Sequence, residues 1–200
     1  MLTGWAWMSS ATTLLGVADP VRVYEDFASL DLISRCRAGI IVGRSAFEGR
    51  FRPPLSDAAV MPRAVQQPLP IWIGVGGSPD SAERAGRLGL PMTLGYIGGT
   101  VSRLRPLVDT YRAAGERAGH QGALKVAIST HFYAGADRAQ ARAVYPYYHE
   151  YLRPKRPGGR GFVVDRAMFE AGTSNHGAIM IGSAAEITDK TPRRSQGARP

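Results

Sequence analysis

A glycine-rich turn, Gly76-Gly77-Ser78, is the segment of the sequence best suited to binding an anion. It follows an apolar run and precedes a segment with helical spacing, so it would join the carboxyl end of a strand to the amino end of a helix. Free backbone N–H groups and the helix dipole favour an anion at that place, and glycines let a phosphate approach the backbone. Gly76, Gly77, Ser78 and Ser81 are therefore candidate binding residues, although the same turn would also serve as a plain loop with a helix cap.

Three further residues follow predicted strands at the end where α/β proteins build their sites. Arg44 comes directly after an apolar run that ends at Gly43, and its planar guanidinium can donate twice to a phosphate. Gly98 and Gly99 follow a later run and could let a ligand approach the backbone. The alternatives are a surface arginine and an ordinary turn.

His131 is the candidate catalytic residue. It lies near the end of a predicted strand, 124–133, and an imidazole there could act as a general acid or base. A single histidine is more often structural, and His120, His149 and His176 are weaker candidates still. The four tyrosines between residues 145 and 151 are interpreted as packing, because no basic strand pattern accompanies them as it would in a platform for stacking bases.

Several familiar kinds of site are missing from the sequence. We find no Ser-His-Asp order with a nucleophile elbow, no Walker motif and no metal-ligand spacing, so hydrolase, nucleotidase and metal sites are not indicated. The dinucleotide fingerprint is also incomplete, since Pro79 stands where its last glycine would be.

The elements that would position these residues alternate along the chain. Two runs, 38–43 and 69–75, are continuously apolar and rich in β-branched residues, which is typical of parallel strands covered on both faces. Asp19-Pro20 and Ser78-Pro79 have the residue types of helix starts. The order predicts an α/β protein with a mainly parallel sheet. Strands are also expected at 11–15 (buried), 91–97, 124–133 and 177–182, and helices at 19–34, 78–88, 101–118, 136–152 (interrupted at Pro146) and 166–171.

The charge of the chain is unevenly distributed. Its net charge is +9, of which the segments 151–166 and 189–200 carry +4 and +3. Such runs are usually solvated loops or tails, so we expect no specific binding of nucleic acid, although a basic binding module remains an alternative. The segment 189–200 is polar without an apolar period, and we expect it to be a disordered basic tail.

Composition bounds the class of protein. With 200 residues, 44% apolar and 20% charged, the sequence is that of a globular protein, and its apolar stretches are too short to cross a membrane. The single cysteine, Cys36, cannot close an intramolecular disulfide, and no Lys or Arg precedes Arg22 as a secretory signal would require. We therefore expect a cytoplasmic protein with an inert thiol.

Ordered blocks of the sequence resemble the luciferase-like flavin-dependent monooxygenases, over roughly residues 9 to 187. The resemblance implies a (β/α)₈ TIM barrel that uses reduced FMN or a deazaflavin coenzyme on a small organic substrate, by oxygen insertion or hydride transfer. It also implies that the flavin phosphate lies at Gly77 and Ser78. Members often have Gly-Gly where this chain has Arg35-Cys36, a place suited to positive φ. The blocks are 19–34, 39–45, 68–79, 85–91 and 177–183.

Measured against that family, the barrel is expected to be incomplete. The first two strands, most of the segment after Ser45 and the last strand and helix have no counterpart, and 44–67 shows no pattern of helix or strand. We expect one domain over 1–188 that exposes strand edges and therefore forms a homo-oligomer. The alternative is a catalytically inactive remnant that serves, if at all, as an interaction module.

Overall fold

The computed structural model describes residues 8–10, 12–14, 18–43, 59–99, 101–159 and 161–197. These residues form two compact units. Unit 1 comprises the described residues up to Leu94 together with Leu107–Ala127, and unit 2 comprises Gly95–Pro106 together with those from Ile128 onward. That both units belong to one domain over 1–188 stays a prediction.

Unit 1 is built on a parallel sheet. The strand order is β1-β3-β4-β5-β6, with β2 also paired to β3. Ile40 pairs with Ile71, and Ile73 pairs with Met92, in parallel register. The predicted α/β class with a parallel sheet is confirmed. The strands are β1 (Met8–Ser9), β2 (Thr13–Leu14), β3 (Ala38–Gly43), β4 (Ile71–Val75), β5 (Met92–Gly95) and β6 (Val126–Ser129), the last two continuing into unit 2.

Within the described residues, the strand predicted at 11–15 is confirmed at Thr13 and Leu14, but the prediction that it is buried is wrong. Only Thr13 and Leu14 form strand β2, and the side chain of Leu14 is 42% exposed. The reason is position, because β1 and β2 follow one another along the same edge of β3 and β2 has no further strand beside it in the described sheet.

Helix α1 (Pro20–Ser34) begins as predicted. The Asp19 carboxylate accepts a hydrogen bond from Val21 N at 3.0 Å, with Pro20 in the first turn. Val23 and Phe27 pack on a small core of Ala28, Ile40, Ala64 and Leu69. The helix ends in two successive left-handed residues, Arg35 (φ 55°) and Cys36 (φ 63°), where the family resemblance suggested positive φ.

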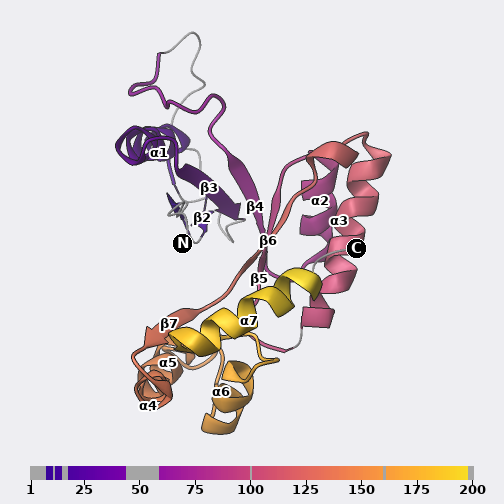
Figure 1. Ribbon diagram of the computed structural model, residues 1–200. Coiled ribbons are helices and arrows are strands. Elements are labelled where there is room, and N and C mark those ends of the chain that lie inside the picture. Colours follow the sequence, from indigo (N-terminus) through magenta and orange to yellow (C-terminus); the bar gives the residue numbers. More distant parts are fainter. Residues whose placement is uncertain are drawn as a thin grey trace. The chain divides into compact units, whose positions relative to one another are not determined.

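Helix α2 (Pro79–Arg87) and helix α3 (Arg105–Arg117), which belongs to unit 1 from Leu107 onward, lie side by side, as Figure 1 shows. Gly86 makes this approach possible, because a Cβ there would lie 2.9 Å from Gly115 N and would overlap the Tyr111 carbonyl oxygen. The buried Tyr111 hydroxyl also donates to Leu90 O at 3.0 Å and accepts from Lys125 N at 3.1 Å. Short 3₁₀ turns, Val101–Leu104 and Gln121–Ala123, flank α3.

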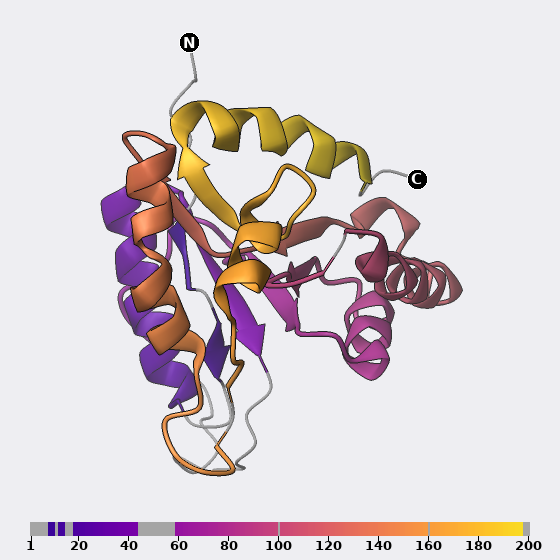
Figure 2. The ribbon, with the colours of Figure 1, turned by 90° about the horizontal axis from the view of Figure 1, so that it is seen from below.

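Unit 2 surrounds a second, two-stranded parallel sheet of β7 (Phe132–Gly135) and β8 (Met180–Ser183). Figure 2 shows β8 leading directly into the last helix, α7 (Ala184–Gly197). The other helices are α4 (Arg138–Ala143), α5 (Tyr145–Leu152) and α6 (Arg166–Thr173). The buried core consists of Tyr96, Ala141, Tyr148, Val164, Phe169, Ala178, Ile179 and Ile181.

The single strand expected at 124–133 is in fact two strands, β6 and β7, which belong to different sheets. Between them Thr130 Oγ1 donates to Ala178 O at 2.6 Å, and His131 O accepts from Met180 N at 2.9 Å. These bonds attach the chain to Ala178 and to the first residue of β8, and the apolar pattern of the run gives no sign of the change of partner.

The chain also differs from expectation after residue 189. Where the sequence suggested a disordered tail, α7 continues to Gly197. Ser183 and Glu186 form a reciprocal capping box at its start, and the buried Lys190 ammonium donates to Thr173 O and Ile179 O. Polar contacts of Ser183, Glu186 and Lys190 therefore hold the first part of this helix. Residues 198–200 lie outside the described part.

Candidate functional site

The turn Gly76-Gly77-Ser78 joins β4 to α2, as predicted. Gly77 has φ +121°, a conformation open to glycine and strained for other residues. Both glycines are exposed, and a Cβ built on either would meet no atom within 4 Å. The backbone of the turn is therefore open to an approaching group.

The serines of this site differ from each other. Ser78 is the N-cap of α2, as predicted, but its side chain makes no capping hydrogen bond. Its carbonyl accepts from Ser81 N at 3.2 Å and Ala82 N at 3.3 Å. Ser81 is 9% exposed. The exposed carboxylate of Asp80 lies in the first turn, where it opposes an anion.

Gly98 and Gly99 form a turn in unit 2. The Tyr96 hydroxyl donates to Gly99 O at 2.7 Å, and Gly99 has φ +82°. A Cβ at Gly99 would press on the Arg103 side chain, whereas one at Gly98 would meet nothing within 4 Å. Arg44, the remaining candidate for phosphate binding, lies outside the described residues.

His131 lies between β6 and β7 rather than at a strand end, and its ring is half-buried. Its Nδ1 is 2.9 Å from the hydroxyl of Tyr148 on α5, and the rings of Tyr148 and Tyr151 meet the imidazole edge-on. Burial lowers the pKa of His131. Burial, with a smaller contribution from Tyr151, raises the pKa of Tyr148 to about 12. Both partners are therefore neutral at pH 7.

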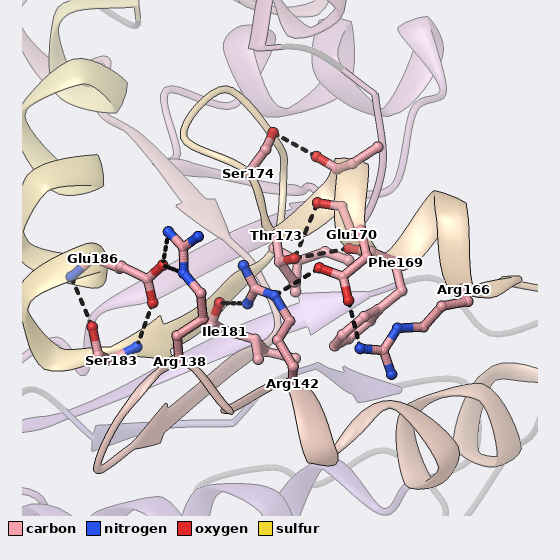
Figure 3. A network of polar contacts seen from close by, with 12 residues as sticks. Arg138, Arg142, Arg166, Phe169, Glu170, Thr173, Ser174, Ile181, Ser183 and Glu186 are labelled. Carbon is pink, nitrogen blue, oxygen red and sulfur yellow. Dashed lines mark hydrogen bonds and ion pairs between the residues drawn. The ribbon is translucent and has the colours of Figure 1, made fainter. Parts of the chain in front are cut away.

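Unit 2 also contains a polar network that sequence reasoning missed (Figure 3). Arg142 donates to Glu170 at 2.8 Å and to Ile181 O at 3.0 Å, and Arg166 pairs with the same Glu170 at 2.7 Å. Arg138 pairs with Glu186, the residue that caps α7. These contacts join α4, α6, β8 and α7. Only the Ser-x-x-Glu spacing of the cap is a signal that the sequence could have provided. The partners of Arg138 and Arg142 are 28 or more residues away in the sequence, and Arg166 was interpreted as part of a charged loop.

The candidate residues are distributed over both units. Gly76, Gly77, Ser78 and Ser81 lie together in unit 1, whereas Gly98, Gly99 and His131 lie in unit 2. Their joint action in one site stays a prediction. Within the described ranges, no group of three His, Cys, Asp or Glu side chains is placed to hold a metal ion. Among the helices of those ranges, none has both the length and the apolar character to span a bilayer.

Comparison with known families decides the relationship. The model of the family described as luciferase-like monooxygenase matches residues 45–197. The chain belongs to this family. No curated protein sequence matches it.

Solved structures of two monooxygenases and of a reductase share its fold. Monooxygenase RslO1 from Streptomyces bottropensis aligns with a TM-score of 0.67 at 19% identity, over 96% of this chain and 68% of that one. The coenzyme F420 dependent tetrahydromethanopterin reductase from Methanopyrus kandleri gives 0.65 at 14%, over 96% and 74%. The oxygenating constituent of 3,6-diketocamphane monooxygenase from Pseudomonas putida, in complex with FMN, gives 0.57 at 15%, over 96% and 70%. The luciferase-like barrel fold is thus confirmed, and the chain spans about two thirds to three quarters of these neighbours.

Proposed function

We propose that this luciferase-like monooxygenase binds a reduced flavin, FMN or a deazaflavin coenzyme, and uses it to oxidise or reduce a small organic substrate. One structural neighbour was solved in complex with FMN, and another depends on coenzyme F420. Bound flavin would supply the redox chemistry, while the protein would hold it and exclude water.

The open turn between β4 and α2 carries this proposal. Gly76 and Gly77 leave the backbone uncovered at the amino end of a nine-residue helix, which suits a phosphate. Because Ser81 N and Ala82 N already bond to Ser78 O, the phosphate would take its hydrogen bonds from the amides of the turn and from the Ser78 hydroxyl. Gly98 and Arg44 are proposed as further contacts to the flavin.

A fluorescence titration with FMN and with riboflavin tests the role of the phosphate. The two molecules share the isoalloxazine ring, but riboflavin lacks the phosphate. We expect saturable binding of FMN and binding at least about tenfold weaker for riboflavin, equal to about 1.4 kcal/mol. Equal affinities would place the phosphate away from the turn. F420 is titrated in parallel to decide between the two cofactor classes.

Gly76→Asp is the sharpest variant, because Gly76 has no positive φ and a side chain there has open space. The carboxylate would repel the phosphate and weaken FMN binding at least about tenfold. Gly76→Asn has nearly the same size without the charge, so its loss should be smaller. Gly122→Asp adds the same charge at another open glycine of unit 1 and serves as the control. Gly77→Asp is less informative, since φ +121° would strain any side chain.

The alternative is a catalytically inactive chain that acts as an interaction module. Absence of saturable binding of both FMN and F420 at millimolar concentration would favour it. We also propose that the protein is cytoplasmic and self-associates through its strand edges. Sedimentation of the purified chain, in which a monomer at all concentrations would contradict self-association, tests the second statement.

A further inference from the structure

We infer that Tyr148 holds neutral His131 in the tautomer that carries its proton on Nε2, so that His131 offers a hydrogen-bond donor rather than a base. Tyr148 is thereby a positioning residue. The aromatic ring of Tyr148 packs in the core of unit 2, whereas its hydroxyl fixes the tautomer of His131.

The side chains of Tyr148 and His131 are in direct contact. Tyr148 Oη lies 2.9 Å from His131 Nδ1, and the two rings are 5.4 Å apart at 75°. Tyr148 is 7% exposed and packs against Phe169 with ring centroids 5.5 Å apart. The backbone around His131 is attached to Ala178 by Thr130 Oγ1 and to the first residue of β8 by Met180 N. Both residues are therefore held in place by contacts beyond the one between them.

The direction of the hydrogen bond follows from the donors available. A phenol has one proton to donate, and a neutral imidazole has one donor and one acceptor nitrogen. In the described part of the chain, His131 Nδ1 is the acceptor within reach of the Tyr148 hydroxyl. If Nδ1 carried the proton and donated it, the buried phenolic proton would lose its partner, which is costly. Tyr148 therefore donates, Nδ1 accepts, and the imidazole proton is on Nε2.

The chemical consequence concerns the outer nitrogen. An Nε2–H group can donate to an oxygen or nitrogen of a bound molecule on which negative charge develops, but it cannot remove a proton from it. This use of the donor rests on the proposed flavin-dependent function, whereas the tautomer does not. The titratable side chains that contact the imidazole in the described residues are Tyr148 and Tyr151, both on α5.

The tautomer can be measured directly in the full chain labelled with ¹⁵N-histidine. Above the pKa of His131, long-range ¹H–¹⁵N spectra should show an unprotonated Nδ1 and a protonated Nε2. A protonated Nδ1, or equal populations of the two forms, would overturn the inference. The measurement needs neither flavin nor substrate, so a failed flavin titration leaves its outcome unaffected.

A matched pair of variants tests the part played by the hydroxyl. Tyr148→Phe removes the bond that favours neutral imidazole, so the titration midpoint of His131 should rise by about half to one pH unit. Tyr151→Phe should leave the midpoint unchanged. Tyr151 meets the imidazole through an edge-on ring contact, with ring centroids 5.9 Å apart, rather than through a hydrogen bond. The same midpoint in both variants would contradict the inference. If Tyr148→Phe does not fold, the spectrum of the unmodified chain still decides.

Discussion

The buried carboxylate of Asp31 is held by Gln66, which donates to it from its backbone N–H at 2.8 Å and from its side-chain Nε2 at 2.6 Å. The same Nε2 also donates to Ala38 O at 2.9 Å. Helix α1, strand β3 and the segment 59–70, which has neither helix nor strand, thus meet at one carboxylate. A segment without regular structure is fixed by side-chain chemistry in this way.

Asp31→Asn should destabilise the protein by about 1–3 kcal/mol, because the new amide would turn a donor toward the donors of Gln66. Urea unfolding measures the change. Asp26→Asn, an exposed carboxylate on the same helix, is the control and should be nearly neutral. Equal effects of the two substitutions would show that Gln66 contributes nothing through Asp31.

The same pair predicts a pH dependence. Burial alone would raise the pKa of Asp31, but the hydrogen bonds from Gln66, together with those from the backbone of Ala38 and Val65, outweigh it and lower the pKa below the ordinary 3.8. The stabilisation is therefore fully present above that value and is lost as pH falls through the lowered pKa. Unfolding free energies measured down the acid range should fall less steeply for Asp31→Asn than for the unmodified chain.

Arg35→Gly should stabilise the protein by about 1 kcal/mol, because φ 55° is unfavourable for a side chain and ordinary for glycine. Glycine also makes the unfolded chain more flexible, and this larger entropy offsets part of the gain in stability. Arg37→Gly is the control, because Arg37 does not have a positive φ. This substitution should destabilise the protein, since it removes the hydrogen bond from Arg37 Nε to Ser34 O. Thermal unfolding compares the two.

Tyr111→Phe should cost about 1–3 kcal/mol, since removal of the buried hydroxyl leaves Lys125 N without its acceptor and Leu90 O without its donor. Tyr147→Phe, at an exposed tyrosine, is the control. If both variants unfold at the same urea concentration, the bridge from α3 to these two backbone segments carries no net stability.

Glu186→Ala should loosen the start of α7 by about 1 kcal/mol, because Ser183 N loses its acceptor and Arg138 its partner. Glu186→Gln keeps the reciprocal cap but not the charge, so its effect should be smaller. Hydrogen exchange of the α7 amides reports the opening. Faster exchange in Glu186→Ala than in Glu186→Gln is the expected pattern, and identical exchange in both variants would argue against the cap.

The sequence predicted those elements whose signals are local. Strand β3 has the expected bounds because its run is continuously apolar and β-branched, and α1 starts where Asp19-Pro20 indicated. The division between β6 and β7 was not predictable, since it depends on bonds from Thr130 and Met180 to partners in other segments. Part of the site shows the same contrast. The Gly76 turn followed from its spacing, whereas the bond from Tyr148 to His131 joins residues that were interpreted separately, one as packing and one as catalytic.

The ion pairs of unit 2 reduce the positive charge that its basic side chains can offer to a polyanion. Arg166 faces Glu170, and Arg153 and Lys155 face Glu150, so several charges of the segment 151–166 already have a carboxylate beside them. A phosphate backbone would have to displace these carboxylates before it gained the same contacts. Fewer counterions would then be released than the formal charge suggests, and the logarithm of any affinity for nucleic acid should fall only gently with the logarithm of salt concentration.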